Sequence, residues 1–103
     1  MKITGDWATR RVTVDGRTLS PKRSQKIWNH SPDGFAWGYG GSGPAQLALA
    51  VLIKAGLKPS RAVQLHQEFK RDWIAVLPQR DFEIELDVML WVQDHAHVFR
   101  ETV

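Results

Sequence analysis

The sequence contains no cysteine among its 103 residues. This absence excludes disulfide bonds, thiol catalysis and cysteine-ligated zinc together. Long apolar runs are also lacking, because the longest, Leu47 to Ile53, falls far short of the ~20 residues of a membrane-spanning helix. The first residues form no apolar stretch of the kind found in signal peptides. We therefore expect a cytoplasmic protein without a membrane-embedded segment.

Acidic residues are scarce in the first part of the chain, and basic residues are scarce in the last part. Residues 1–80 hold 13 of the 14 lysines and arginines but 5 of the 11 acidic residues. Residues 81–103 hold the other 6 acidic residues and a single arginine. Such a division can attract a charged partner, or it can draw two faces of one domain together within the fold. The sequence leaves both interpretations open.

The apolar content predicts one compact domain over residues 1–103. Hydrophobic residues make up 43% of the chain and include five tryptophans, which is enough for a core without covalent staples. We predict an α+β domain with an N-terminal β-hairpin (residues 1–19), a long loop rich in aromatic residues and glycine (20–43) and a part with helices and a strand (44–103). In the last part, three helices and a short strand near residue 84 surround a buried central helix.

Local patterns place the first elements. Val12 and Val14 alternate with polar residues, and Asp15-Gly16 is typical of a two-residue hairpin turn, so the return strand occupies residues 17–19. The central helix begins near Pro44 with Ser42 as its N-cap, and Gly56 ends it. Phe35 and Trp37 alternate with Ala36, which suggests a short strand within the loop.

The second half of the chain shows two further helices and a strand. Ser60 is the expected cap of a helix from residue 61 to about 76, "DFEIEL" alternates like a strand, and Asp87 is the expected cap of the last helix. Phe99 is expected on the apolar side of that last helix. The residues predicted to be buried are Leu47, Val51, Leu52, Phe69, Trp73 and Trp91.

The stretch "WGYGGSGPAQLALAVL" raises the question of a phosphate-binding loop. Gly38, Gly40 and Gly43 satisfy the dinucleotide pattern G-x-G-x-x-G, yet no acidic residue follows at the required distance. A Walker loop needs lysine where Pro44 stands. The loop is therefore interpreted as a structural turn, with a weak anion site at the amides of Ser42 and Gly43 as the remaining functional hypothesis.

This stretch carries a family resemblance. The segment "SPDGFAWGYGGSGPAQLALAVL" resembles the signature of domain-of-unknown-function family 6166, and "FK", "IAVLP" and "LDVMLWV" follow in that family's order. The resemblance covers about Val12 to Val92. It implies a chain found in bacteria, archaea, phages and plasmids, with no established activity and hence no catalytic residues to transfer. It also implies an accessory role in a mobile element, such as blocking a host defence component as an anti-CRISPR inhibitor does.

The main candidate site is an N-terminal basic cluster that is interleaved with tryptophan. We predict a non-enzymatic interaction module that binds a partner protein through Arg10, Arg11, Arg23, Lys26 and Trp28. We also expect that reversing the charge of the three arginines removes binding without lowering the melting temperature (Tm). Nucleic-acid binding by the same cluster is the alternative, because cations neutralise phosphates and rings stack on bases. A small enzyme of unknown class is the third hypothesis.

The histidines and the acidic row carry weaker signals. His95 and His97 could chelate a metal on a strand, but they are expected to be exposed residues of the tail, and His66 a hydrogen-bonded residue at the edge of the core. We predict neither a metal ion nor a cofactor. One alternating acidic row shares a strand face, where it is expected to be solvated or to dock a basic surface; it consists of Asp81, Glu83, Glu85 and Asp87.

Overall fold

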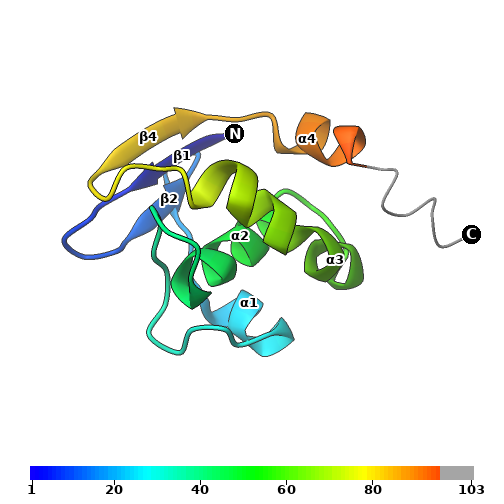
Figure 1. The fold of residues 1–103 in the computed structure, drawn as a ribbon, viewed down its shortest axis with the longest axis horizontal. Coiled ribbons are helices and arrows are strands. Elements are labelled where there is room, and N and C mark those ends of the chain that lie inside the picture. Colours follow the sequence, from blue (N-terminus) through cyan, green and yellow to red (C-terminus); the bar gives the residue numbers. More distant parts are fainter. Residues whose placement is uncertain (96–103) are drawn as a thin grey trace, which may run out of the picture.

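A four-stranded antiparallel sheet forms one end of the molecule. The structure, a computed structural model, describes residues 1–95. Its strands are β1 (Lys2–Gly5), β2 (Val12–Val14), β3 (Arg17–Thr18) and β4 (Phe82–Glu85), in the order β3-β2-β1-β4. Figure 1 shows β4 beside the N-terminal strand, although about eighty residues separate the two in sequence. Together with the helices, this sheet confirms the predicted α+β class.

The hairpin forms as predicted, with one strand more. Asp15 and Gly16 both have positive φ, at 49° and 82°, as a tight turn between β2 and β3 requires. The sequence interpretation missed β1. The side of β1 that faces the core holds Ile3 and Gly5. Because Gly5 has no side chain, the sequence lacks the apolar alternation typical of a strand, and the ring of Phe82 occupies the space at Gly5.

Helix α2 (Ser42–Lys54) is the buried centre of the fold. Residues 43–53 are all buried, so the expectation for an almost wholly apolar helix is confirmed. Gly56, with φ of 108°, ends it: its N–H donates to the carbonyl of Ile53, and that of Leu57 donates to Leu52. The expected capping role of Ser42 is wrong, since Gly41 is the N-cap and no side chain caps this end.

The segment from residue 20 to 43 is not one long loop. It contains the short helix α1 (Lys22–Ile27), which packs against α2 and lies at the opposite end of the molecule from β4 (Figure 1). Its only buried residue is Ser24, so the sequence shows no periodic apolar pattern that would predict this helix. The prediction of a strand at residues 35–37 is wrong, since the backbone there joins no ladder. Trp37 is instead fully buried, and its indole N–H donates to the carbonyl of Arg80 at 3.0 Å.

The predicted helix over residues 61–76 is split in two. Helix α3 (Pro59–Phe69) continues into a π-helical turn, η1 (Lys70–Ile74). The wider turn shifts the phase of the inward stripe by one residue, so Ile74 is buried and Trp73 is only partly buried. The prediction of a buried Trp73 is therefore wrong, whereas those for Phe69 and Trp91 are confirmed.

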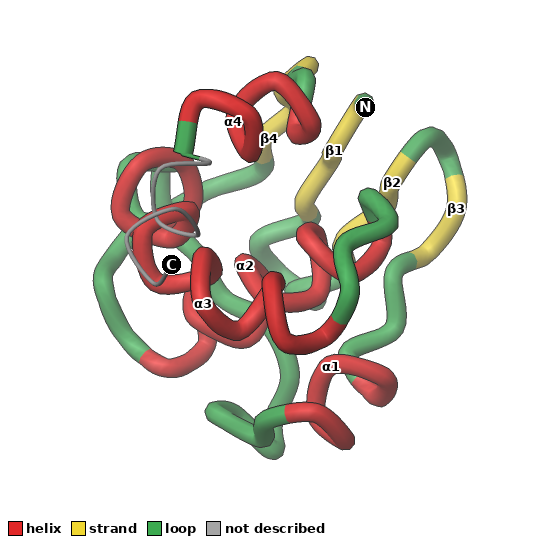
Figure 2. Tube along the Cα trace, turned by 90° about the vertical axis from the view of Figure 1, so that its right-hand side faces the viewer, coloured by secondary structure: helices red, strands yellow, loops and turns green. Residues whose placement is uncertain are grey.

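The last described helix is α4 (Val88–Asp94), which follows β4 in the chain and lies next to it in Figure 2. Asp87 caps it as predicted, because its Oδ1 accepts the N–H of Leu90 at 2.9 Å. Phe99 and His97 lie outside the described residues. Among residues 1–95, no helix combines the length and apolar character that crossing a bilayer requires.

Candidate functional site

The glycine-rich loop serves as a packing turn. Gly38, with φ of 85°, donates its N–H to the carbonyl of Ile74 at 3.0 Å and accepts from Gln79 at 3.1 Å. Gly43 packs so closely that a Cβ there would lie 2.7 Å from the Cβ of Ala36. Both contacts hold the loop against the helices, as the structural interpretation requires. The anion-site hypothesis for Ser42 and Gly43 stays a prediction: Ser42 is exposed and Gly43 is buried.

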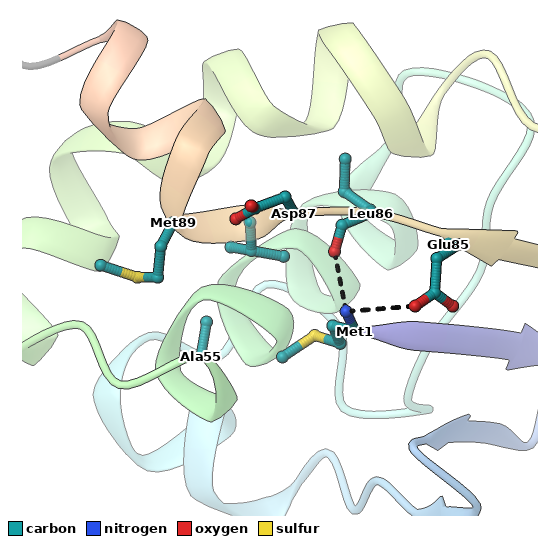
Figure 3. Close-up of a pocket in the computed structure, with 7 residues that line it drawn as sticks. Met1, Ala55, Glu85, Leu86, Asp87 and Met89 are labelled. Carbon is teal, nitrogen blue, oxygen red and sulfur yellow. Dashed lines mark hydrogen bonds and ion pairs between the residues drawn. The ribbon is translucent and has the colours of Figure 1, made fainter.

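A shallow hollow lies where the N-terminus meets α4 (Figure 3). It encloses about 450 Å³. Its lining is mostly apolar and comprises Met1, Ala55, Glu85, Leu86, Asp87, Val88 and Met89.

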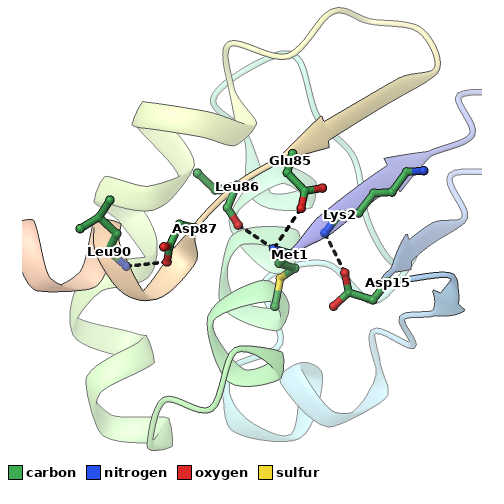
Figure 4. A network of polar contacts seen from close by, with 7 residues as sticks. All are labelled: Met1, Lys2, Asp15, Glu85, Leu86, Asp87 and Leu90. Carbon is green, nitrogen blue, oxygen red and sulfur yellow. Dashed lines mark hydrogen bonds and ion pairs between the residues drawn. The ribbon is translucent and has the colours of Figure 1, made fainter.

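The polar groups of this hollow already have structural partners (Figure 4). The amino group of Met1 donates to the carbonyl of Leu86 at 3.0 Å and lies 3.8 Å from Glu85. Asp87 is occupied as the cap of α4. Outside the lining of the hollow, Asp15 accepts the N–H of Lys2 at 2.8 Å. These contacts join β1 to its neighbours. They leave the hollow without a pair of polar groups aimed at a common point, so it offers no set for acid–base chemistry.

The acidic row lies exposed, as expected. Glu83 pairs with Lys2 at 3.6 Å on the outer face of the sheet, and Asp81 accepts the N–H of Trp7 at 2.7 Å. The ion pairs of β4 are thus made with β1 and the N-terminus. Since α1 lies at the other end of the molecule, the acidic row and the basic helix do not neutralise each other (Figure 1).

Arg10 belongs to the fold as much as to the basic cluster. Its guanidinium lies 3.5 Å from the ring centre of Trp7 and 5.8 Å from that of Trp37. Trp7 in turn packs edge-on against Trp37, with ring centres 5.6 Å apart. This cation–π contact stabilises a turn in which Arg10 has φ of 61°. The contact leads us to expect instead that charge reversal at Arg10 lowers Tm.

The other predicted residues divide between two hollows and the end of α1. Arg11 lines a hollow of about 330 Å³ with Arg10, and Arg23 lines one of about 210 Å³; both hollows share Thr18, Leu19 and Ser20. Lys26 is exposed in the last turn of α1, two residues before Trp28. The structure thus brings the arginines to adjoining surfaces and places Lys26 and Trp28 at the far end of the helix.

Trp28 is exposed yet firmly held. Its side chain is 48% exposed, and its ring stacks on that of His30 with centres 4.4 Å apart and planes at 25°. Its N–H donates to the carbonyl of Ser24 at 2.9 Å, and its own carbonyl accepts from Gln46 at 3.2 Å. Gln46 is fully buried in α2. The backbone that carries Trp28 is therefore tied to the centre of the core.

Beneath Trp28, two histidines face each other. The Nε2 atoms of His30 and His66 lie 2.9 Å apart, and the Nδ1 of His66 lies 2.6 Å from the carbonyl of Val63. A neutral imidazole that donates from Nδ1 accepts at Nε2, so His30 donates in this pair. Burial lowers the pKa of both imidazoles, and the charge of Lys70 lowers them further. Both rings are consequently neutral at pH 7.

Sequence reasoning missed this pair. It placed His66 at the edge of the core, which is confirmed, since that residue is 1% exposed and hydrogen-bonded. Its partner His30 comes from the segment interpreted as loop, 36 residues away. One signal was present: Gln46 is a polar residue in an apolar helix, and its side chain accepts the N–H of His30 at 2.8 Å.

A comparison with protein-family models returns a match over residues 4–95, to a family of unknown function, DUF6166. The chain belongs to DUF6166. The DUF6166 match confirms the resemblance; it begins within β1 and spans every later strand and helix of the described residues, together with Trp28 and both facing histidines. Searches of curated proteins and of solved structures each return no match.

The last residue of the DUF6166 match, His95, is not an exposed tail residue as expected. It stacks on Trp91, with ring centres 4.0 Å apart, and only 22% of its side chain is exposed. Its Nε2 lies 3.5 Å from Asp72 and 3.8 Å from Glu68. Within residues 1–95, no three histidine, cysteine or acidic side chains form a group suited to a metal ion.

Proposed function

We propose that this DUF6166 protein is a non-enzymatic interaction module that binds a partner protein through Trp28 and the basic face of α1. The observation that carries the proposal is the state of Trp28. A large aromatic ring stays 48% exposed while stacking and hydrogen bonds fix its position. Because little side-chain freedom is left to lose, such a ring is suited to anchor an interface.

The charge around this anchor defines the chemistry of the partner. Lys22, Arg23 and Lys26 are exposed on α1, and the helix contains no acidic residue. A partner surface with acidic side chains around an apolar pocket would complement it. Binding would cover the surface of that partner and so block its other contacts. The expectation that the partner is a host defence component comes from the family resemblance alone.

Nucleic-acid binding remains the second candidate, for one specific reason. Exposed cations on α1 beside a half-exposed indole are also the ingredients of a surface that contacts phosphates and stacks on a base. The two candidates differ in salt dependence. Nucleic-acid affinity falls steeply and linearly with the logarithm of salt concentration, whereas affinity for a protein anchored by tryptophan falls gently.

The experiment compares capture by variants in host lysate, with and without nuclease. Trp28→Ala removes the anchor and Lys26→Glu reverses an exposed charge. Tyr39→Ala is the matched control, because Tyr39 is 47% exposed and does not belong to α1. The proposal predicts a protein that wild type and Tyr39→Ala retain after nuclease treatment and that the two other variants lose. Retention that disappears with nuclease would favour the second candidate.

A further inference from the structure

The facing histidines are arranged as two ligands of one metal ion. We infer that His30 and His66 bind a divalent transition-metal ion, of which zinc is the test case, through their Nε2 atoms. Imidazole nitrogen is a preferred ligand of zinc, copper and nickel. The inference goes beyond the proposed function and does not depend on it, since the metal alone tests it.

The distance between the two nitrogens fits a shared metal ion. Two nitrogens bound to one zinc ion at about 2.0–2.1 Å, with a tetrahedral angle between them, lie about 3.3 Å apart. In the structure the Nε2 atoms of His30 and His66 lie 2.9 Å apart. A separation larger by about 0.4 Å therefore admits the ion, and small rotations of half-buried His30 supply that change. The proton that His30 carries at Nε2 moves to its Nδ1 through solvent, which frees the Nε2 lone pair for the ion.

The surroundings of His66 prepare it as a ligand. Metal-binding histidines usually give their second N–H to a backbone carbonyl or a carboxylate, which fixes the ring and the tautomer. The Nδ1 of His66 makes this contact with the carbonyl of Val63 at 2.6 Å. Its Nε2 therefore carries the lone pair and points toward His30. No proton has to leave the Nε2 of His66, because its ring proton lies at Nδ1, on the carbonyl of Val63.

A third ligand lies within reach. The side-chain amide of Gln67 is 3.3 Å from the Nε2 of His66, and a half-turn of that amide presents its oxygen in place of its nitrogen. Trp28 covers His30 on one face and limits the access of bulk water. Water completes the coordination of the ion on the open side. When bound, the ion fixes His30, and with it the ring that stacks there.

The charge of Lys70 should weaken metal binding, so its removal tests whether affinity changes in the expected direction. Its positive charge acts electrostatically on both histidines, so it also repels a cation bound between them. Lys70→Gln should therefore tighten zinc binding severalfold. A variant whose affinity rises through charge alone is not explained by a general loss of structure.

The experiment titrates the full chain with Zn²⁺ by calorimetry and with Co²⁺ by visible absorption, which reports nitrogen coordination. Wild type should bind one ion. Because His30 is only half-buried, His30→Gln should fold and should bind zinc at least about tenfold more weakly than wild type. The matched control is His95→Gln, since His95 lies near Glu68 and Asp72 and forms the competing surface site. Its affinity should equal that of wild type.

Three results would overturn the inference. The first is the absence of Zn²⁺ binding by the folded wild type. The second is binding that His30→Gln leaves unchanged, and the third is binding that His95→Gln removes. If His66→Gln fails to fold, because His66 is buried, His30→Gln and Lys70→Gln still decide the outcome.

Discussion

The indole of Trp28 lies on the imidazole of His30, with ring centres 4.4 Å apart, and the Nε2 of that imidazole lies 2.9 Å from the Nε2 of buried His66. An exposed ring is thus connected to the core through a chain of two histidines. The arrangement requires His66 to be neutral, because its Nε2 accepts from His30 and a protonated ring can only donate. The solution behaviour of this pair therefore reports on the geometry of the candidate site.

Stability should fall as the pH is lowered below about 6.5. Burial lowers the pKa of His30 and that of His66 in the folded chain, whereas both return to the ordinary value of 6.5 on unfolding. Between the folded and unfolded pKa values, the unfolded chain binds more protons, so the free energy of unfolding rises with pH and is fully present above 6.5. Thermal melts between pH 7.5 and about 5 measure this slope.

The control for that prediction is His30→Gln. Glutamine keeps hydrogen-bonding capacity but does not titrate, so this variant should lose less stability on acidification than wild type. Equal slopes for the two proteins would contradict the neutral pair. The charge of Lys70 lowers the pKa of both histidines, so Lys70→Gln should raise both pKa values toward those of the unfolded chain. This variant should therefore lose less stability on acidification than wild type.

Gly38 and Gly40 differ in what a methyl group would meet. At Gly38 φ is 85°, and a Cβ would lie 2.6 Å from the side chain of Gln79 and 3.0 Å from the carbonyl of Leu77. At Gly40 there is nothing within 4 Å. We expect Gly38→Ala to cost about 1–3 kcal/mol and Gly40→Ala to change stability little, as measured by urea denaturation. Equal effects at the two positions would show that the loop does not dock as described.

The structure also explains why the fold could be predicted only in part. Apolar α2, the Asp15-Gly16 turn and the Asp87 cap are set by neighbouring residues, so the sequence indicates them. Strand β1 and helix α1 depend on distant partners instead. Lys2–Gly5 pairs with residues near 84, and the helix is held by the contact of Gln46 with Ser24 at 2.8 Å. Local periodicity contains neither relationship.

Leu52→Ala tests the central position of α2. Leu52 is fully buried, and truncation of such a side chain costs about 2–5 kcal/mol through lost burial and the cavity left behind. Val76→Ala is the control, because Val76 is 69% exposed and should tolerate the change. Chemical denaturation of both variants gives the comparison. A small cost at Leu52 would mean that α2 does not fill the core.

Truncation of Arg10 and truncation of its neighbour Arg11 should affect Tm differently. Arg10→Ala removes the guanidinium from Trp7, a contact worth about 1 kcal/mol, and should lower Tm. Exposed Arg11→Ala should leave Tm unchanged. If both variants melt like wild type, the cation–π contact does not stabilise the turn.

The candidate site shows the same limit of sequence reasoning. Charge and tryptophan content pointed to Arg23, Lys26 and Trp28, since composition alone reveals a basic aromatic segment. The pair of His30 and His66 could not be found, because 36 residues separate its members and only the packing of both α1 and α3 against α2 brings them together. The widened turn at η1 likewise follows from packing rather than from a local pattern.

Capture by wild type and by Trp28→Ala in nuclease-treated lysate tests the central claim most directly, with Tyr39→Ala beside them and melting curves to show that all three are folded. The account predicts one protein that wild type and Tyr39→Ala retain and that Trp28→Ala loses. Equal retention by Trp28→Ala would contradict the claim that this ring anchors the interface. Loss of all retention after nuclease treatment would contradict a protein partner.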